Sequence, residues 1–378
     1  MTDDLTLHAH LVGRQGSRAD LNTPVLVLDV AALDRNIATM AGLAASHGIG
    51  LRPHAKTHKS VDIAKRQLAA GAAGVCCAKI GEAEVLAKGG VTGILITSPV
   101  AAPRAIERLA ALAGSAEGLM AVVDHPAVAA RIDAALDTRL DVIIDIDPGI
   151  ARTGVASPEA AVALAEAIAG LPNLNYRGVQ FYCGRQQHIE GYADRRAAIE
   201  ERTAYLQTVI AALAAAGHPP EIVTGSGTGT HRIDLDLGVF TELQAGSYVF
   251  MDKQYLDCDL TGDGAVPFET SLGVDARVVS ANHSGLVTID AGYKSLSTDG
   301  GVAVVRRGAP ESAAFVFMGD EHAALISPGI GEALPPRDPV TLTVPHCDPT
   351  VNLYDHYHVV EGETLVAIWP VSARGRAR

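Results

Sequence analysis

The pattern of apolar and polar residues differs between two successive parts of the chain. From Leu26 to Gly246, short runs rich in Val, Ile and Leu are each followed by an Ala-rich stretch whose apolar residues recur every three or four positions. Such a pattern predicts buried strands that alternate with amphipathic helices, as in parallel βα units. About eight units over roughly 220 residues favour an α/β fold of the (β/α)8 TIM-like barrel type over a doubly wound sheet.

The expected elements have the following bounds. Barrel strands are predicted at residues 50–53, 74–77, 94–97, 120–123, 142–147, 178–182, 222–224 and 241–245. Helices are predicted at residues 32–47, 60–70, 80–88, 102–112, 127–136, 158–169 and 194–216. A further strand at 24–28 precedes the first unit and either joins the barrel or packs on the C-terminal part of the chain.

After residue 250 the helical periodicity ends and a mostly β region begins. Short strands are predicted at 272–280, 285–290, 313–318, 340–344, 356–360 and 364–369, separated by turns of Gly, Pro and Asp. The sequence therefore predicts two domains, a barrel over residues 25–270 and a β domain over residues 271–378, with residues 1–28 as a segment that can pack on the β domain.

Composition and charge narrow the class of protein. The 378 residues carry 30 Lys and Arg against 43 Asp and Glu, a net charge of −13, and only 4% of them are aromatic. A nucleic-acid interface needs a basic face or stacking aromatics, so no nucleic-acid partner is expected. The odd number of cysteines, 5, argues against a disulfide framework, and the sequence shows neither a signal peptide nor a membrane span. We expect a cytoplasmic protein.

The segment 51–59, Leu-Arg-Pro-His-Ala-Lys-Thr-His-Lys, carries the most chemistry. It follows the first predicted barrel strand, and residues at the carboxyl ends of barrel strands line active sites. A lysine such as Lys56, with cationic neighbours in a closed site, has its ammonium form disfavoured, and the neutral amine can form a Schiff base with an aldehyde. The alternative interpretation is a solvated loop that opens a helix.

The run RPHAKTHK, with Thr23-Pro24 and Leu28-Asp29 upstream, resembles the group of D-threonine aldolases and D-serine dehydratases, which are pyridoxal phosphate enzymes of the alanine racemase fold. The similarity continues in order along nearly the whole chain, at 74–77, 152–154, 178–188, 225–229, 241–252, 290–294, 320–322, 346–355 and 369–375. The resemblance implies a homodimer in which each chain has a barrel and a C-terminal β domain. It also implies pyridoxal 5'-phosphate on Lys56 rather than on Lys59.

A second segment is suited to the phosphate of that cofactor. The loop at 225–229, Gly-Ser-Gly-Thr-Gly, follows a predicted strand and offers backbone N–H groups at the seventh strand, where barrel phosphate sites gather. Taken alone, such a loop is more often a turn. The residues that match the family's phosphate-binding positions are Ser226, Gly227, Thr228, Gly229, Ser247 and Tyr248.

Arg152 and Tyr182 complete the predicted cofactor site. The resemblance implies that Arg152 faces the phenolic oxygen of the cofactor and that the hydroxyl of Tyr182 faces the pyridine nitrogen. From the sequence alone, an ion pair with Asp147 is an equally good interpretation of Arg152. A neutral tyrosine leaves the pyridine nitrogen largely unprotonated, so the ring is a weaker electron sink and a second electrophile is needed. This favours a metal ion.

His346 and Asp348 are the predicted metal ligands. They flank Cys347 at the end of a predicted strand, and residues two apart in an extended segment project to the same side. The alternative is a polar turn before Pro349. Aldolases of the resembling group carry His-x-Asp here and the dehydratases carry His-x-Cys, so Asp348 favours an aldolase. It also favours a hard divalent cation, Mn²⁺ or Mg²⁺, with Zn²⁺ or Ca²⁺ as alternatives.

Two further residues are candidates for proton transfer. The resemblance implies that His188, after the sixth strand, lies near the metal and acts as the base for the substrate's β-hydroxyl, and the usual pKa of histidine suits that role. Asp320, with His322, ranks below it. Cys183, Arg185 and Ala78 depart from the family pattern, and Arg185 favours a substrate with an additional carboxylate.

The predicted partner is therefore a small amino-acid substrate. We expect a D-threonine aldolase that depends on pyridoxal phosphate and a divalent metal and cleaves D-3-hydroxy-α-amino acids to glycine and an aldehyde. The alternatives with the same fold are a 3-hydroxy-D-aspartate aldolase, which forms glycine and glyoxylate, a D-serine or 3-hydroxyaspartate dehydratase, and a racemase that needs no metal. A non-catalytic pyridoxal phosphate carrier is disfavoured by residues 271–378, because carriers resembling this barrel lack a large β domain.

Overall fold

The computed structural model describes residues 3–378 and divides them into two compact units. The β unit consists of residues 3–37, 247–257 and 268–374. The barrel unit consists of residues 38–246, 258–267 and 375–378. The chain therefore passes from one unit to the other several times.

Eight parallel strands form the barrel unit, in the order β2-β9-β8-β7-β6-β5-β4-β3. Their bounds are β2 (Gly50–Leu51), β3 (Val75–Cys77), β4 (Ile94–Ile96), β5 (Met120–Val123), β6 (Leu140–Asp145), β7 (Leu174–Phe181), β8 (Ile222–Gly225) and β9 (Glu242–Leu243). A parallel bridge between His54 and Cys76 joins the two ends of this order, so the sheet closes on itself. The predicted barrel and the places of its eight strands are confirmed.

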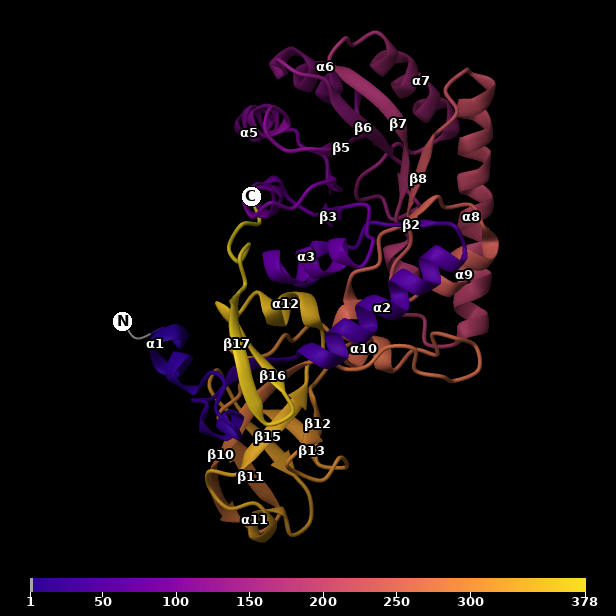
Figure 1. Ribbon diagram of the computed structural model, residues 1–378. Helices are drawn as coiled ribbons and strands as arrows, with labels where there is room; N and C mark the ends of the chain where they lie inside the picture. Colours follow the sequence, from indigo (N-terminus) through magenta and orange to yellow (C-terminus); the bar gives the residue numbers. More distant parts are fainter. Residues whose placement is uncertain (1–2) are drawn as a thin grey trace. The chain divides into compact units, whose positions relative to one another are not determined.

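The helices of the barrel unit follow the strands along the chain, and Figure 1 shows α5 to α8 beside β5 to β8. They are α2 (Val30–Ser46), which begins in the β unit, α3 (Val61–Ala69), α4 (Ile80–Lys88), α5 (Pro103–Ala113), α6 (Pro126–Ala135), α7 (Pro158–Ala169), α8 (Tyr192–Ala215) and α9 (His231–Leu237). All four residues of β5 are buried, because a parallel strand is covered on both faces. Local chemistry sets the helix starts, since Ser157 Oγ accepts the N–H of Ala160 at 3.2 Å and Pro158 occupies the first turn of α7.

A nine-stranded sheet dominates the β unit, in which Figure 1 shows β16 and β17 side by side. Its main path is β13-β14-β11-β10-β1-β16-β17, and β15 pairs with β10 and β12. The strands are β1 (Val25–Asp29), β10 (Leu272–His283), β11 (Leu286–Ile289), β12 (Val304–Arg307), β13 (Ala314–Phe317), β14 (Ala323–Ile326), β15 (Pro339–Thr343), β16 (His356–Glu361) and β17 (Thr364–Pro370). The short helices are α1 (Asp4–His8), α10 (Lys253–Leu256), α11 (Ile330–Ala333) and α12 (Cys347–Val351).

One strand resolves an open alternative in the sequence analysis. The segment at 24–28 does not join the barrel, because β1 pairs antiparallel with β10 and parallel with β16. Val25 and Val27 of this strand pack in one buried apolar cluster with Leu11, Val360 and Leu365. Residues from both ends of the chain therefore share the core of the β unit.

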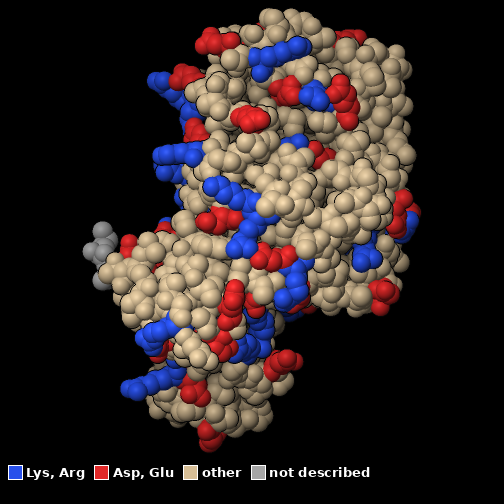
Figure 2. Space-filling model, viewed as in Figure 1, with Lys and Arg blue, Asp and Glu red and all other residues tan. Residues whose placement is uncertain are grey.

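The surface carries charges of both signs. Figure 2 shows basic and acidic side chains interspersed over the visible face, so the net charge of −13 does not form a single patch there. Among residues 3–378, no helix is both long enough and apolar enough to cross a membrane. All five cysteines are buried and unpaired with one another.

Candidate active site

A cavity of about 500 Å³ opens at the carboxyl ends of the barrel strands. Successive strand ends contribute to its wall: Lys56 after β2, Lys79 after β3, Thr97 after β4, Asp124 after β5, Arg152 after β6, Tyr182 after β7 and Gln244 after β9. This is the face at which barrel enzymes place their chemistry. The cavity is therefore the candidate active site of the barrel unit.

Three of the predicted cofactor residues meet around this cavity. Lys56 belongs to the 3-10 turn η3 (Ala55–Thr57) directly after β2, and its Nζ lies 5.7 Å from the centre of the Tyr182 ring. The guanidinium carbon of Arg152 lies 6.0 Å from the same ring. The alternative ion pair between Arg152 and Asp147 is not formed in the described chain, since Asp147 instead accepts the backbone N–H groups at 149–151.

A polar network that the sequence analysis missed lies at the wall of the cavity. The Gln180 side-chain amide donates to Asp145 at 2.9 Å and to the carbonyl of Thr97 at 3.0 Å, and its oxygen accepts from Gln244 at 3.2 Å. Burial raises the pKa of Asp145 to about 6, although the hydrogen bond from Gln180 acts in the opposite direction. A carboxyl group with a raised pKa beside a cavity is a candidate proton carrier. The only sequence signal for it was an acid at the end of a buried apolar strand, two residues before Asp147.

The predicted phosphate loop follows a strand close to the one that precedes Lys56. Lys56 comes after β2 and the loop at 226–229 comes after β8, and only β9 lies between these two strands in the barrel. Ser226 has a left-handed backbone (φ 69°), and its buried Oγ has no hydrogen-bond partner within residues 3–378. A buried hydroxyl in need of a partner, next to glycines without side chains, fits the phosphate of the predicted cofactor.

Several other predicted residues lie in the β unit. Ser247 and Tyr248 begin the 3-10 turn η5 (Ser247–Val249), and the buried ring of Tyr248 lies 5.6 Å from that of Phe268. The Asp320 side chain is 70% exposed and lies 3.7 Å from the Lys294 amino group. The roles assigned to Ser247, Tyr248 and Asp320 stay predictions.

His188 lies in the barrel unit and is itself exposed, in the segment between η4 (Gly184–Gln186) and α8. The buried Arg195 of α8 holds the end of this segment that leads into the helix. Its guanidinium donates to the carbonyls of Ile189, Glu190 and Asp259. Its role as a base stays a prediction.

The predicted metal pair lies at the start of α12. His346 has an extended backbone and precedes the helix, whereas Asp348 belongs to its first turn. The segment is therefore not extended through both residues, and the alternation argued from sequence is wrong for Asp348. Cys347 is fully buried, and burial raises the pKa of its thiol well above the usual value.

His346 has a partner that suits a metal ligand. Its Nδ1 lies 2.8 Å from Asp299 Oδ2, and a carboxylate accepts that proton. The proton of a neutral imidazole is then held on Nδ1, which leaves the Nε2 lone pair for a cation. The donor set of His346 and Asp348 therefore fits a divalent ion, with Asp299 orienting the imidazole.

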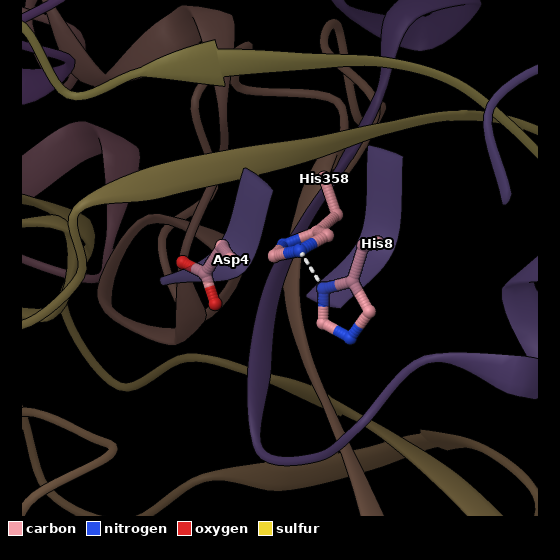
Figure 3. A group of neighbouring side chains, drawn as sticks. All are labelled: Asp4, His8 and His358. Atoms are coloured by element: carbon pink, nitrogen blue, oxygen red, sulfur yellow. Dashed lines mark hydrogen bonds between the residues drawn. The ribbon is translucent and has the colours of Figure 1, made fainter. Parts of the chain in front are cut away.

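A second group of potential ligands, Asp4, His8 and His358, lies elsewhere in the β unit, and Figure 3 shows the two imidazoles inclined to each other and joined by a hydrogen bond. The backbone N–H of Asn22 donates to His8 Nε2 at 3.0 Å, so the His8 proton resides on Nδ1. That N–H donates to His358 Nε2 at 2.8 Å. Both nitrogens of His8 are thus engaged in hydrogen bonds. His8 and His358 form a neutral hydrogen-bonded pair, which does not have the arrangement of a metal site.

Comparison with known protein families gives matches along both units. Residues 28–254 match the model described as alanine racemase, N-terminal domain. Residues 271–360 match the model described as putative serine dehydratase domain. The two matches together cover most of the chain.

Individual relatives match nearly end to end. The chain is 37% identical to the 3-hydroxy-D-aspartate aldolase of Paracoccus denitrificans (strain Pd 1222), over 95% of this chain and 93% of the relative. The crystal structure of D-threonine aldolase from Filomicrobium marinum superposes with a TM-score of 0.90 at 37% identity, covering 95% of this chain and 97% of that one. The D-threo-3-hydroxyaspartate dehydratase of Delftia sp. (strain HT23) is 31% identical over 76% of each chain.

Proposed function

The chain belongs to the family described as alanine racemase, N-terminal domain, and on that premise we propose that it is a pyridoxal phosphate-dependent aldolase that cleaves D-3-hydroxy-α-amino acids to glycine and an aldehyde. The observation that carries this proposal is the cavity in which the Lys56 amino group, Arg152 and Tyr182 meet at the carboxyl ends of the barrel strands. The enzyme is thus a carbon–carbon lyase.

Each residue of the barrel unit has a distinct task in this proposal. Lys56 would hold the cofactor covalently, Tyr182 would face its ring nitrogen, and Ser226 and Thr228 would donate hydrogen bonds to its phosphate. When bound, the cofactor supplies an electron sink for the bond that breaks. Arg152 would keep a positive charge beside the cofactor's phenolic oxygen, and Asp145 can hold or release a proton near neutral pH because its pKa is about 6.

We further propose a divalent cation, Mn²⁺ or Mg²⁺, on His346 and Asp348. A bound cation supplies Lewis acidity, which lowers the pKa of a hydroxyl group that coordinates it. His188 would receive the hydroxyl proton. Asp348 supports an aldolase over a dehydratase, since a carboxylate suits hard cations whereas a thiolate suits zinc.

The test is product analysis with D-threonine and with 3-hydroxy-D-aspartate, after chelation and after Mn²⁺ or Mg²⁺ is restored. Glycine with acetaldehyde or with glyoxylate, formed only with metal, supports the proposal and identifies the preferred substrate. Formation of 2-oxobutyrate and ammonia from D-threonine would assign the chain to the dehydratases, for which its similarity to the Delftia enzyme is the specific observation. Racemised substrate without metal would contradict both.

The proposed working form is a homodimer in the cytoplasm. The resemblance to the family supports a homodimer, and five buried cysteines that form no disulfide suit a reducing compartment. Light scattering on the purified enzyme measures its mass directly, and a mass of one chain would contradict the dimer.

A further inference from the structure

We propose that Gln187 is a positioning residue that holds the loop at 225–229 in the shape that receives the cofactor's phosphate. The inference rests on the proposed function, because it concerns the same cofactor. Gln187 follows η4 and precedes His188, and none of its surface is exposed. Its side chain reaches from this segment to the loop after β8.

The hydrogen bonds of Gln187 leave its amide a single orientation. The backbone N–H of Gly229 donates to Oε1 at 3.0 Å, and because a backbone N–H is always a donor, the oxygen must face the loop. The Nε2 group then donates to the carbonyl of Cys183 at 3.2 Å and to the hydroxyl oxygen of Thr230 at 3.0 Å. The Thr230 hydroxyl in turn donates to Asp234 at 2.6 Å. Gln187 therefore ties the end of β7, the loop and the start of α9 together.

The same side chain explains two glycines of the loop. Neither Gly227 nor Gly229 has a positive φ, so backbone conformation does not require glycine at these positions. A Cβ on Gly227 would lie 2.3 Å from Gln187 Oε1, and a Cβ on Gly229 would lie 1.9 Å from the backbone oxygen of Gln187. Both distances are far below van der Waals contact. Gln187 therefore occupies the space that side chains at 227 and 229 would need.

This contact divides the tasks within the loop. The N–H of Gly229 is committed to Gln187, so Gly229 supports the loop rather than contacting the phosphate. Ser226, with its left-handed backbone and its buried Oγ without a partner in residues 3–378, is the residue presented for the phosphate. Because His188 directly follows Gln187, the same anchor also fixes one side of the predicted base.

The test compares the affinities of the apoenzyme for pyridoxal phosphate and for pyridoxal, which lacks the phosphate. Gln187→Met keeps the length of the side chain and removes its donors and its acceptor. We expect the Kd for pyridoxal phosphate to rise roughly tenfold or more, as befits the loss of one buried amide's hydrogen bonds, while the Kd for pyridoxal changes by less than about twofold. Equal weakening of both ligands, or no weakening, would overturn the inference. Absence of Schiff-base formation in the wild-type enzyme would instead overturn the proposed function.

A double-substitution series guards against a general loss of folding. Gly227→Ala places its methyl group against the Gln187 side chain, whereas Gly229→Ala places it against the Gln187 backbone. In the Gln187→Ala background, Gly227→Ala should leave the Kd for pyridoxal phosphate nearly unchanged. Gly229→Ala should still raise that Kd. Equal effects of Gly227→Ala in both backgrounds would contradict the contact. Thermal unfolding of each variant confirms that it is folded.

Discussion

At the scale of single residues, Lys56 and Lys59 have different surroundings although they lie three positions apart. Lys59 Nζ lies 3.4 Å from Glu82 Oε1, and both side chains are nearly buried. Lys56 Nζ lies above the ring of Tyr182 and lines the cavity. Lys59 is engaged in a nearly buried ion pair, whereas the amino group of Lys56 lines a cavity that an aldehyde can enter. These surroundings support the proposal that Lys56 carries the cofactor.

Arginine substitutions separate the two lysines, since arginine keeps the charge but cannot form a Schiff base. Lys56→Arg should remove the Schiff-base absorbance of the enzyme with pyridoxal phosphate and reduce turnover to background. Lys59→Arg, the matched control, should keep the absorbance because it can retain the ion pair with Glu82. Absorbance that survives in Lys56→Arg would show that another lysine carries the cofactor.

Asp299 provides a test of the metal site that leaves both proposed ligands in place. Its carboxylate accepts the proton of His346 Nδ1 at 2.8 Å, and a partner of this kind orients a ligating imidazole. Asp299→Asn should lower metal affinity roughly 10- to 100-fold, as measured by reactivation of the chelated enzyme with increasing Mn²⁺. The matched control is Glu311→Gln, which neutralises an exposed carboxylate of the same unit that has no proposed role. An unchanged Mn²⁺ requirement in Asp299→Asn would contradict the assignment of His346.

At the scale of elements, the sequence predicted strands that are buried along their whole length. It did not predict which strands pair when the partners lie far apart in the chain. The barrel strands were found because strands covered on both faces are unbroken apolar runs. β12 and β14 were missed because β12 ends in two arginines and β14 begins with two alanines, which favour a strand less than Val or Ile does. The position of β1 could not be predicted, because its partners lie more than 240 residues away and no local signal selects between two sheets.

One buried side chain links the segments that meet where the barrel closes, at the short strand β2. Arg52 forms a bidentate ion pair with Glu242 of β9 at 2.9 and 2.8 Å and also donates to the carbonyls of Ala73 and Gly93. Gly74 and Gly93 lie so close to this guanidinium that a Cβ at either position would approach it within 2.3 and 3.2 Å. Arg52 therefore connects β2 to the segments that precede β3 and β4.

Removal of Arg52 should destabilise the barrel more than removal of the whole ion pair. Arg52→Met leaves a buried carboxylate without its partner, and we expect the free energy of unfolding to fall by about 3–5 kcal/mol. In the double variant Arg52→Met, Glu242→Met the loss should be smaller, because no unpaired charge remains. Urea denaturation of the two variants measures the difference. A double variant that is less stable than Arg52→Met would contradict this account.

At the scale of the whole molecule, the sequence could predict those site residues that follow a recognisable barrel strand. Lys56, Arg152 and Tyr182 each follow an apolar run, so their meeting at one cavity could be predicted from barrel geometry. Asp299, Gln187 and Asp145 act through partners 47, 42 and 35 residues away, respectively. Such pairs depend on tertiary contacts, and nothing in the local sequence identifies them.

The two units differ in the buried groups that titrate below neutral pH. In the β unit, burial lowers the pKa of His358 to about 4, and burial likewise lowers the pKa of His8. Asp4 opposes these shifts, whereas the nearby His10 and His356 add to them. An unfolded histidine has a pKa near 6.5, so between about pH 6.5 and 4 the unfolded β unit binds more protons than the folded one. Acid therefore destabilises this unit through both buried histidines.

In the barrel unit, the buried groups with shifted pKa values have opposite effects on stability in acid. Burial raises the pKa of Asp145 and of Asp234 to about 6, so the folded form binds more protons between about pH 4 and 6 and gains stability as the pH falls. His231, whose pKa burial lowers to about 4, opposes this gain. Asp252 of the β unit also has a raised pKa, so it stabilises that unit in acid. Its effect is opposed by that of the two histidines His8 and His358. Among these buried groups, the balance of proton binding favours the barrel unit in acid.

Acidification should consequently open the β unit before the barrel unit. At pH 4.5, brief digestion with pepsin followed by mass spectrometry should give its first cleavages within residues 3–37 and 268–374, because protease cuts the chain where it unfolds most readily. The variant His8→Asn, His358→Gln keeps polar partners but cannot bind the additional protons, so it should resist these cleavages longer than the wild type. Added Zn²⁺ should give no protection, since both His8 nitrogens are engaged. First cleavages within the barrel unit would show that the proton balance of the two units is the reverse of the one derived from their buried groups.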